Sequence, residues 1–158
     1  MKYIFYISFL FTTLFLASCN SENSKSKTSE QIVEQEKPIL DVKAFIGKSL
    51  KEVEQILGKA ERIEKIKGYP CKKSKCEKAF FEKEKYEVIF KKGKVDRISI
   101  NDTSDFTEDD NAIQKLGLPA SEPSFKNPGN VIRWTSVEGV HEISFFSTYI
   151  YIIINPAD

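Results

Sequence analysis

Short apolar runs separated by glycine turns are the feature that most constrains how this 158-residue chain can fold. Residues 86–90 and 95–100 are two such runs, and the tetrapeptide between them, Lys91-Lys92-Gly93-Lys94, carries glycine where a tight turn needs it. This pattern predicts a β-hairpin. Similar runs recur along the chain. Together they predict seven strands, at residues 61–69, 77–82, 86–91, 94–101, 131–136, 140–147 and 149–155.

Two short helices are expected before the first of these strands. Residues 41–47 form one that ends at Gly47, and Ser49 with Glu52 has the Ser-x-x-Glu spacing of a capping box. In a capping box each side chain satisfies a backbone N–H that the helix leaves unpaired, so a second helix begins here. Gly58 provides its end. The apolar positions of this helix share one face, and they are Leu50, Val53, Ile56 and Leu57.

The same order of elements recurs about 59 residues later. Residues 107–110 can cap a helix that carries Ala112, Ile113 and Leu116, and glycine again follows the last apolar position. A repeat this short cannot bury its helix alone. We therefore expect an α+β fold with two tandem helix-plus-antiparallel-meander repeats that share one core. The expected repeats span about residues 41–101 and 105–155.

The N-terminus is expected to be a targeting segment. After Met1-Lys2, residues 3–16 form an apolar run with the length of a signal-peptide h-region. The run is too short to cross a membrane, which takes about 20 apolar residues. It ends in Leu16-Ala17-Ser18-Cys19, which resembles the lipobox of bacterial lipoproteins. The alternative is an ordinary secretory signal with a coincidental cysteine.

The lipobox resemblance implies an anchor. Residues 1–18 would be cleaved as a signal peptide, and Cys19 would become acylated and hold the chain on the lipid bilayer. Because Asn20 is not the aspartate that retains many lipoproteins at the inner membrane, the outer membrane is favoured, on its periplasmic or surface face. Residues 20–38 contain too few apolar groups to fold, so we expect a flexible tether before a domain at residues 39–158.

A family resemblance rests on the segment from Gly47 to Gly58, followed by a strand meander with Phe90, Gly93, Val95 and Ile98. This pattern resembles G-x-S/T-x-x-E/Q-V-x-x-x-L-G of the SmpA/OmlA (BamE) lipoproteins and of the tandem-repeat β-lactamase-inhibitor-protein fold. The resemblance implies an envelope lipoprotein that binds other proteins, with outer-membrane assembly or integrity as the expected process.

Cys71 and Cys76 flank a short lysine-rich segment between two predicted strands. In an exported chain, the simplest interpretation is a disulfide. A redox pair is a weaker alternative because the C-x-x-C spacing is missing, and a zinc site is weaker still because two thiolates need further ligands.

Catalysis has little support in the sequence, and we expect no enzyme activity. His141 is the only histidine, and no recognisable nucleophile motif accompanies it. The acidic residues between 102 and 110 lack the glycine and the order of a calcium loop, so helix capping explains them better. We therefore expect no cofactor, no metal and no nucleic-acid partner.

Charge is divided unevenly along the chain. Residues 41–97 contain 17 Lys/Arg and 10 Asp/Glu, whereas residues 98–158 contain 3 and 9. This polarity is suited to steering a partner, to orienting the domain over anionic headgroups or to head-to-tail self-contact, although two solvated surfaces explain it as simply.

The last predicted strand is apolar on both faces. Its alternation places Ile150, Ile152 and Ile154 on one side and Tyr149, Tyr151 and Ile153 on the other. One side must face the helices, and the other is a candidate partner-binding surface, unless the sheet is covered on both faces. The candidate residues are Trp134, Phe146, Tyr149 and Tyr151.

Together these features predict a noncatalytic, membrane-anchored interaction module with a protein partner in the bacterial envelope. The alternative is a ligand-binding or enzyme-inhibitory lipoprotein that acts on a soluble envelope target.

Overall fold

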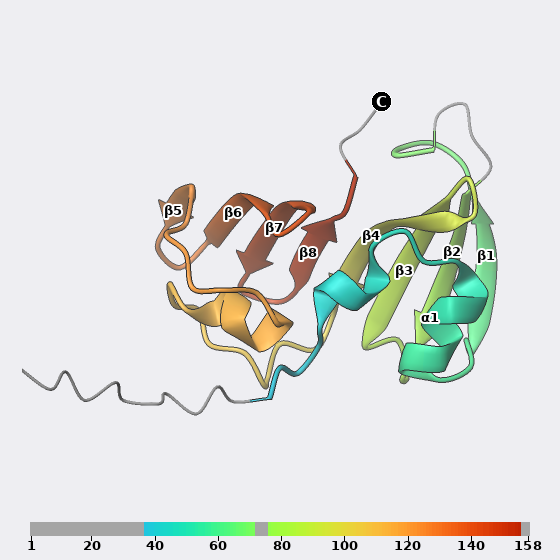
Figure 1. Cartoon of the computed structure of the whole chain (residues 1–158), viewed down its shortest axis with the longest axis horizontal. Coiled ribbons are helices and arrows are strands. Elements are labelled where there is room, and N and C mark those ends of the chain that lie inside the picture. Colours follow the sequence, from blue (N-terminus) through green and yellow to red (C-terminus); the bar gives the residue numbers. More distant parts are fainter. Residues whose placement is uncertain (1–36, 72–75, 156–158) are drawn as a thin grey trace, which may run out of the picture. The chain divides into compact units, whose positions relative to one another are not determined.

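The computed structural model describes residues 37–71 and 76–155, and all of them belong to one compact unit (Figure 1). The predicted signal peptide, the predicted acylation site Cys19, residues 20–36 of the predicted tether and the lysine-rich segment 72–75 lie outside the described residues.

The described strands form one eight-stranded antiparallel sheet with the order β1-β2-β3-β4-β8-β7-β6-β5. All seven predicted strands are present within a few residues of their expected bounds. β5 was not predicted, because its three residues are all exposed and show no alternation. The strands are β1 Arg62–Ile66, β2 Cys76–Phe81, β3 Tyr86–Lys91, β4 Lys94–Ile100, β5 Phe125–Asn127, β6 Val131–Val137, β7 Val140–Phe146 and β8 Ile150–Ile153.

The predicted hairpin is confirmed. β3 and β4 pair up to Lys91 and Lys94, so only Lys92 and Gly93 form the turn. Both residues have positive φ angles, 54° and 76°, which is the conformation that a two-residue hairpin turn requires.

The α-helix is α1, Leu50–Leu57, and it begins with the predicted capping box. The backbone N–H and the hydroxyl of Ser49 both donate to Oε2 of Glu52, at 2.8 and 2.7 Å. These two hydrogen bonds, helped by Lys48, lower the pKa of Glu52 to about 2. The predicted stop at Gly58 is also observed, with a φ of 83°.

The other two predicted helices are 3₁₀ turns, η1 (Val42–Phe45) and η2 (Ala112–Leu116). Segments this short gain little from the i to i+4 pairing of an α-helix, so the tighter turn competes well. In η2 the first turn is held by Asp109, whose carboxylate accepts from the N–H of Asn111 at 2.7 Å and whose carbonyl accepts from Ala112.

One hydrophobic core lies under β2 to β4 and β6 to β8 and contains residues from both halves of the chain. The buried side chains of α1, η1 and η2 all belong to it, so the three described helical segments lie on the same face of the sheet. We call this the helix-covered face. The strand side chains on it include Val88, Ile98, Ile143 and Ile152, which fits the expected α+β class.

Candidate functional site

The opposite face of the sheet is the candidate functional site, and we call it the open face, because no helical segment of the described residues lies on it. Backbone register places one side chain per strand in a row across this face. From β2 to β5, the row is Phe80, Glu87, Ser99, Tyr151, Ser144, Arg133 and Phe125.

Charges on the open face are paired with one another. Lys78 lies 2.7 Å from Glu87, and Arg133 lies 3.2 Å from Glu142. Arg62 of β1 forms ion pairs with Glu64 and Glu84. Its guanidinium also stacks over the ring of Phe80, with Cζ 3.6 Å from the ring centroid. The open face therefore presents polar atoms with little uncompensated charge.

Aromatic side chains gather where β7 turns into β8. The rings of Phe146 and Tyr149 stack with their centroids 4.6 Å apart. Tyr151 lies on the same face of β8, and Phe125 of β5 is 50% exposed at the end of the row. The structure thus brings together three of the four predicted partner-binding residues. It also adds Phe125, which sequence reasoning missed because no strand was predicted there.

Trp134 is the exception, and placing it on the candidate surface was wrong. Its side chain is completely buried on the helix-covered face, where Nε1–H donates to the carbonyl of Ser121 at 2.8 Å. It also meets the ring of Phe145 edge to face, with centroids 5.5 Å apart. The reason is register: Trp134 lies opposite Ile143, a core residue, whereas Arg133 lies opposite Ser144 on the open face.

Arg97 occupies the middle of the open face on β4. A register shift leaves Asp96 unpaired, because Phe90 pairs with Val95 and Ile89 pairs with Arg97. Such a bulge re-aims neighbouring side chains. Nε of Arg97 donates to Oδ2 of Asp96 at 3.1 Å, and both side chains are buried.

Two tyrosines line the guanidinium group of Arg97. The ring of Tyr69 lies over it at 4.6 Å, and the ring of Tyr151 lies at 5.8 Å, with its hydroxyl 3.4 Å from Nη1. Burial raises the pKa of Tyr151, although the nearby guanidinium opposes this, so the phenol stays protonated at neutral pH.

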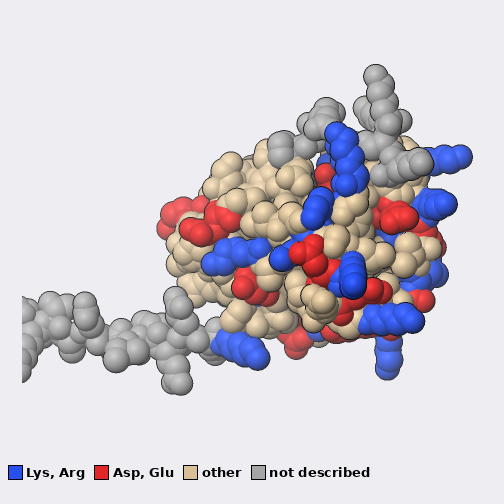
Figure 2. All heavy atoms as spheres, turned by 45° about the vertical axis from the view of Figure 1, so that its right-hand side comes forward, with Lys and Arg blue, Asp and Glu red and all other residues tan. Residues whose placement is uncertain are grey.

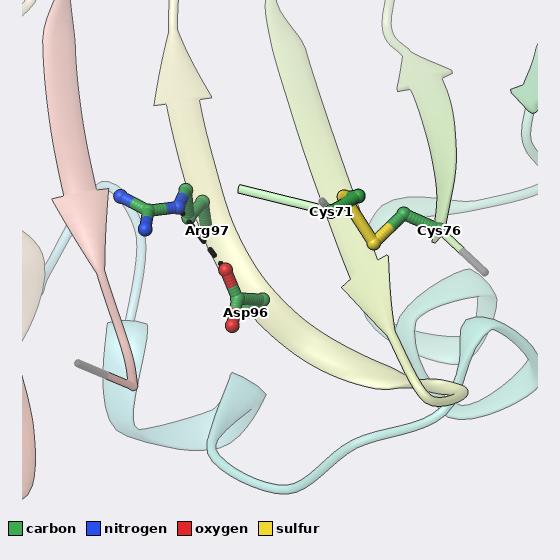
Figure 3. The surroundings of a disulfide bond; sticks show 4 residues. All are labelled: Cys71, Cys76, Asp96 and Arg97. Atoms are coloured by element: carbon green, nitrogen blue, oxygen red, sulfur yellow. Dashed lines mark hydrogen bonds and ion pairs between the residues drawn. A yellow bond between two sulfur atoms is a disulfide. The ribbon is translucent and has the colours of Figure 1, made fainter. Parts of the chain in front are cut away.

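The predicted disulfide is present between Cys71 and Cys76, with a Cα–Cα distance of 5.8 Å (Figure 3). It ties the segment that follows β1 to the first residue of β2. Tyr69 lies two residues before Cys71, so the disulfide limits how far its backbone can move away from the open face.

The described residues contain no group of three or more His, Cys, Asp or Glu side chains that could hold a metal ion. His141 is exposed on β7. A hollow of about 280 Å³ lies beside η2, and its lining residues are Asp110, Asn111, Ala120, Ser121 and Glu122.

The uneven distribution of charge along the sequence corresponds to a basic half and an acidic half of the sheet. β1 to β4 form one half of it and come from the basic part of the chain, whereas β5 to β8 come from the acidic part. Figure 2 shows the side nearest β1 and α1, where many Lys and Arg side chains lie among fewer acidic ones.

No family model, curated protein or solved structure matches this chain. In the part of the chain that the structure describes, no helix is long and apolar enough to cross a membrane.

Proposed function

We propose that this chain is a noncatalytic interaction module of the bacterial envelope, and that the open face binds another envelope protein. The open face carries this proposal, since it combines half-buried aromatic side chains with arginines and internally paired charges. Aromatic residues and arginine are enriched where proteins bind one another, and they account for much of the binding energy.

The proposed mode of attachment is a lipid anchor at Cys19, with the outer membrane favoured. The lipobox at residues 16–19 supports the anchor, and Asn20 supports the outer membrane. Each buried methylene of an acyl chain contributes about 0.8 kcal/mol, so two or more chains hold a protein durably on a bilayer. The anchor would keep the open face close to partners in the same membrane.

We also propose that the two halves of the domain are tandem repeats. Each half supplies a helical segment and then four strands, and the last strands of the two halves, β4 and β8, pair at the centre of the sheet. This order supports the resemblance to the SmpA/OmlA (BamE)-like and β-lactamase-inhibitor-protein-like fold, in which protein binding is the expected role.

Site-specific photocrosslinking in native cells tests the proposal. A photoreactive amino acid replaces Ile153, which is half-buried on the open face, and a matched control replaces Ile56, which is 42% exposed on α1. We expect adducts with an envelope membrane protein from position 153 and not from position 56, and we expect Cys19→Ser to abolish them. Adducts from position 56 alone would contradict the proposal.

The same experiment distinguishes the proposed membrane partner from the enzyme-inhibitory alternative. A soluble envelope target would be captured from position 153 equally well with and without Cys19, because binding would not depend on the membrane. Capture of that kind would replace the membrane-scaffold role with an inhibitory or ligand-binding one.

A further inference from the structure

The guanidinium group of Arg97 carries a buried hydrogen-bond donor that no described residue uses. The Arg97 side chain is 1% exposed, and its Nη2 atom has no hydrogen-bond partner among residues 37–71 and 76–155. Nε donates to Asp96, and Nη1 makes only a long bond of 3.4 Å to the hydroxyl of Tyr151. An unpaired buried donor costs free energy, and in native proteins such groups are uncommon and call for an explanation.

The fold is arranged so that this donor stays unpaired. The bulge in β4 places Asp96 and Arg97 side by side, and the carboxylate contacts only the Nε side of the guanidinium. Figure 3 shows the guanidinium group extending beyond Asp96, away from the disulfide. Arginine presents five N–H donors in a planar fork, so Asp96 balances its charge and leaves terminal donors available.

The surroundings of the terminal nitrogens suit a peptide. The ring of Tyr69 lies over the guanidinium, and Tyr69 is 63% exposed; movement of this exposed side chain is the access to Nη2 that the inference requires. Tyr151 forms a second aromatic wall. By register, Ile89 and Ile153 flank Arg97 on the neighbouring strands and add half-buried apolar surface.

We propose that Arg97 is the polar anchor of the open face and receives a carbonyl oxygen, from the main chain or an amide side chain, on a loop of the partner protein. This inference rests on the proposed function. An uncharged acceptor fits best because Asp96 already neutralises Arg97, and Glu142 lies in the same row of the face, next to Ile153. A carboxylate would add a buried charge with no cation to balance it.

A display experiment with the full-length protein in nanodiscs tests this assignment. The probe is a phage-displayed library of disulfide-constrained peptide loops, selected on the wild-type protein after depletion on empty nanodiscs. We expect Arg97→Lys to weaken the selected loops by about tenfold or more, because lysine keeps the charge and loses the planar fork. Lys51→Arg, at an exposed position on α1 and away from the open face, is the control and should leave the affinity within about twofold.

Salt dependence identifies the acceptor. Binding through a carbonyl oxygen should change little between about 0.05 and about 0.5 M NaCl, whereas a partly exposed carboxylate contact weakens as salt screens it. Loops that carry Asp or Glu and lose affinity steeply with salt would overturn the uncharged-acceptor assignment. Equal binding to wild type and Arg97→Lys, or failure to select any loop, would overturn the anchor itself.

A second measurement needs no variant and covers the case in which Arg97→Lys fails to fold. In the wild-type protein, NMR resonances of the arginine side-chain N–H groups are followed as a selected loop is added. We expect the Arg97 terminal N–H signals to shift and the backbone N–H signal of Lys51, on α1, to stay in place. Shifts at Arg133 without shifts at Arg97 would overturn the proposal.

Failure of the Arg97 anchor can be distinguished from failure of the proposed interaction role. If position 153 gives adducts in cells and Arg97→Lys does not reduce them, the anchor is wrong and the interaction role stands. If loops depend on Arg97 in vitro and position 153 gives no adduct in cells, the envelope interaction role is wrong, and Arg97 keeps only its capacity to bind a carbonyl oxygen in vitro.

Discussion

At the scale of single residues, position within the sheet decides what a side chain does. Arg133 and Trp134 are neighbours in β6, yet one lies on the open face in an ion pair and the other lies in the core. Glu52, by contrast, has a role set by its local spacing from Ser49 alone. The role of Glu52 is therefore tested through local capping, whereas the role of Trp134 is tested through its burial in the sheet.

Glu52 should make stability depend on acid. Its folded pKa, about 2, is below the ordinary value of 4.5, mainly because it accepts the backbone N–H of Ser49. A depressed folded pKa stabilises the protein above the unfolded pKa, and this contribution is lost as pH falls from about 4.5 towards 2. Urea unfolding should show that Glu52→Gln destabilises the protein at pH 7 and that the difference narrows at pH 3.

The control for this prediction is Glu77→Gln, which neutralises an exposed carboxylate on β2. A gap between wild type and Glu52→Gln that stays constant from pH 7 to pH 3 would show that the capping box does not depend on the charge of Glu52.

Trp134 should matter for stability rather than for binding. Trp134→Ala removes a fully buried side chain and should cost about 3–5 kcal/mol in unfolding free energy. Trp134→Phe loses mainly the hydrogen bond to Ser121 and should cost about 1 kcal/mol or somewhat more. Tyr149→Ser, at a 38% exposed position, should cost much less than Trp134→Ala in the same chemical denaturation series. Equal costs for Trp134→Ala and Tyr149→Ser would contradict the burial of the tryptophan.

At the scale of elements, turns and cross-links hold the strands in register. The β3–β4 turn uses two residues with positive φ, and β6–β7 uses Glu138 and Gly139 in the same way. The Cys71–Cys76 disulfide instead joins a strand to the segment that leads into it. Local chemistry of this kind can be recognised before a structure is known.

Removal of the disulfide should have a modest effect. The two cysteines are five positions apart in sequence, and closing so short a loop stabilises a protein by about 2 kcal/mol in the chain-entropy model. Cys71→Ser with Cys76→Ser should lower the unfolding free energy by about that amount. The fold should remain, as judged by far-UV circular dichroism. Complete unfolding of the double variant would mean that the cross-link holds more of the structure than its own loop.

At the scale of the whole molecule, the two halves depend on each other. The sheet continues from β4 into β8, and a single core contains side chains from η1 and α1 as well as from η2 and β6 to β8. Separating the halves would expose that core and break the central strand pairing.

We therefore expect a chain break within residues 102–106 to unfold both halves. A fragment ending at residue 104 should lack a cooperative thermal transition, and mixing it with the remaining fragment should restore one, because β4 and β8 can pair again. A fragment that unfolds cooperatively by itself would show that the first half has an independent core.

The sequence by itself determined the local features of this protein. The strand alternation, the hairpin at Gly93, the Ser49–Glu52 capping box and the Cys71–Cys76 cross-link all rest on residues close together in the chain, so their spacing is visible without coordinates. The tertiary structure decided which face each aromatic residue occupies. In β6, Trp134 alternates with Arg133 and Thr135, and the pairing with β7 places it opposite the core residue Ile143. It also decided the surroundings of Arg97, because its bulge, its two tyrosines and its unpaired nitrogen arise from segments far apart in the chain.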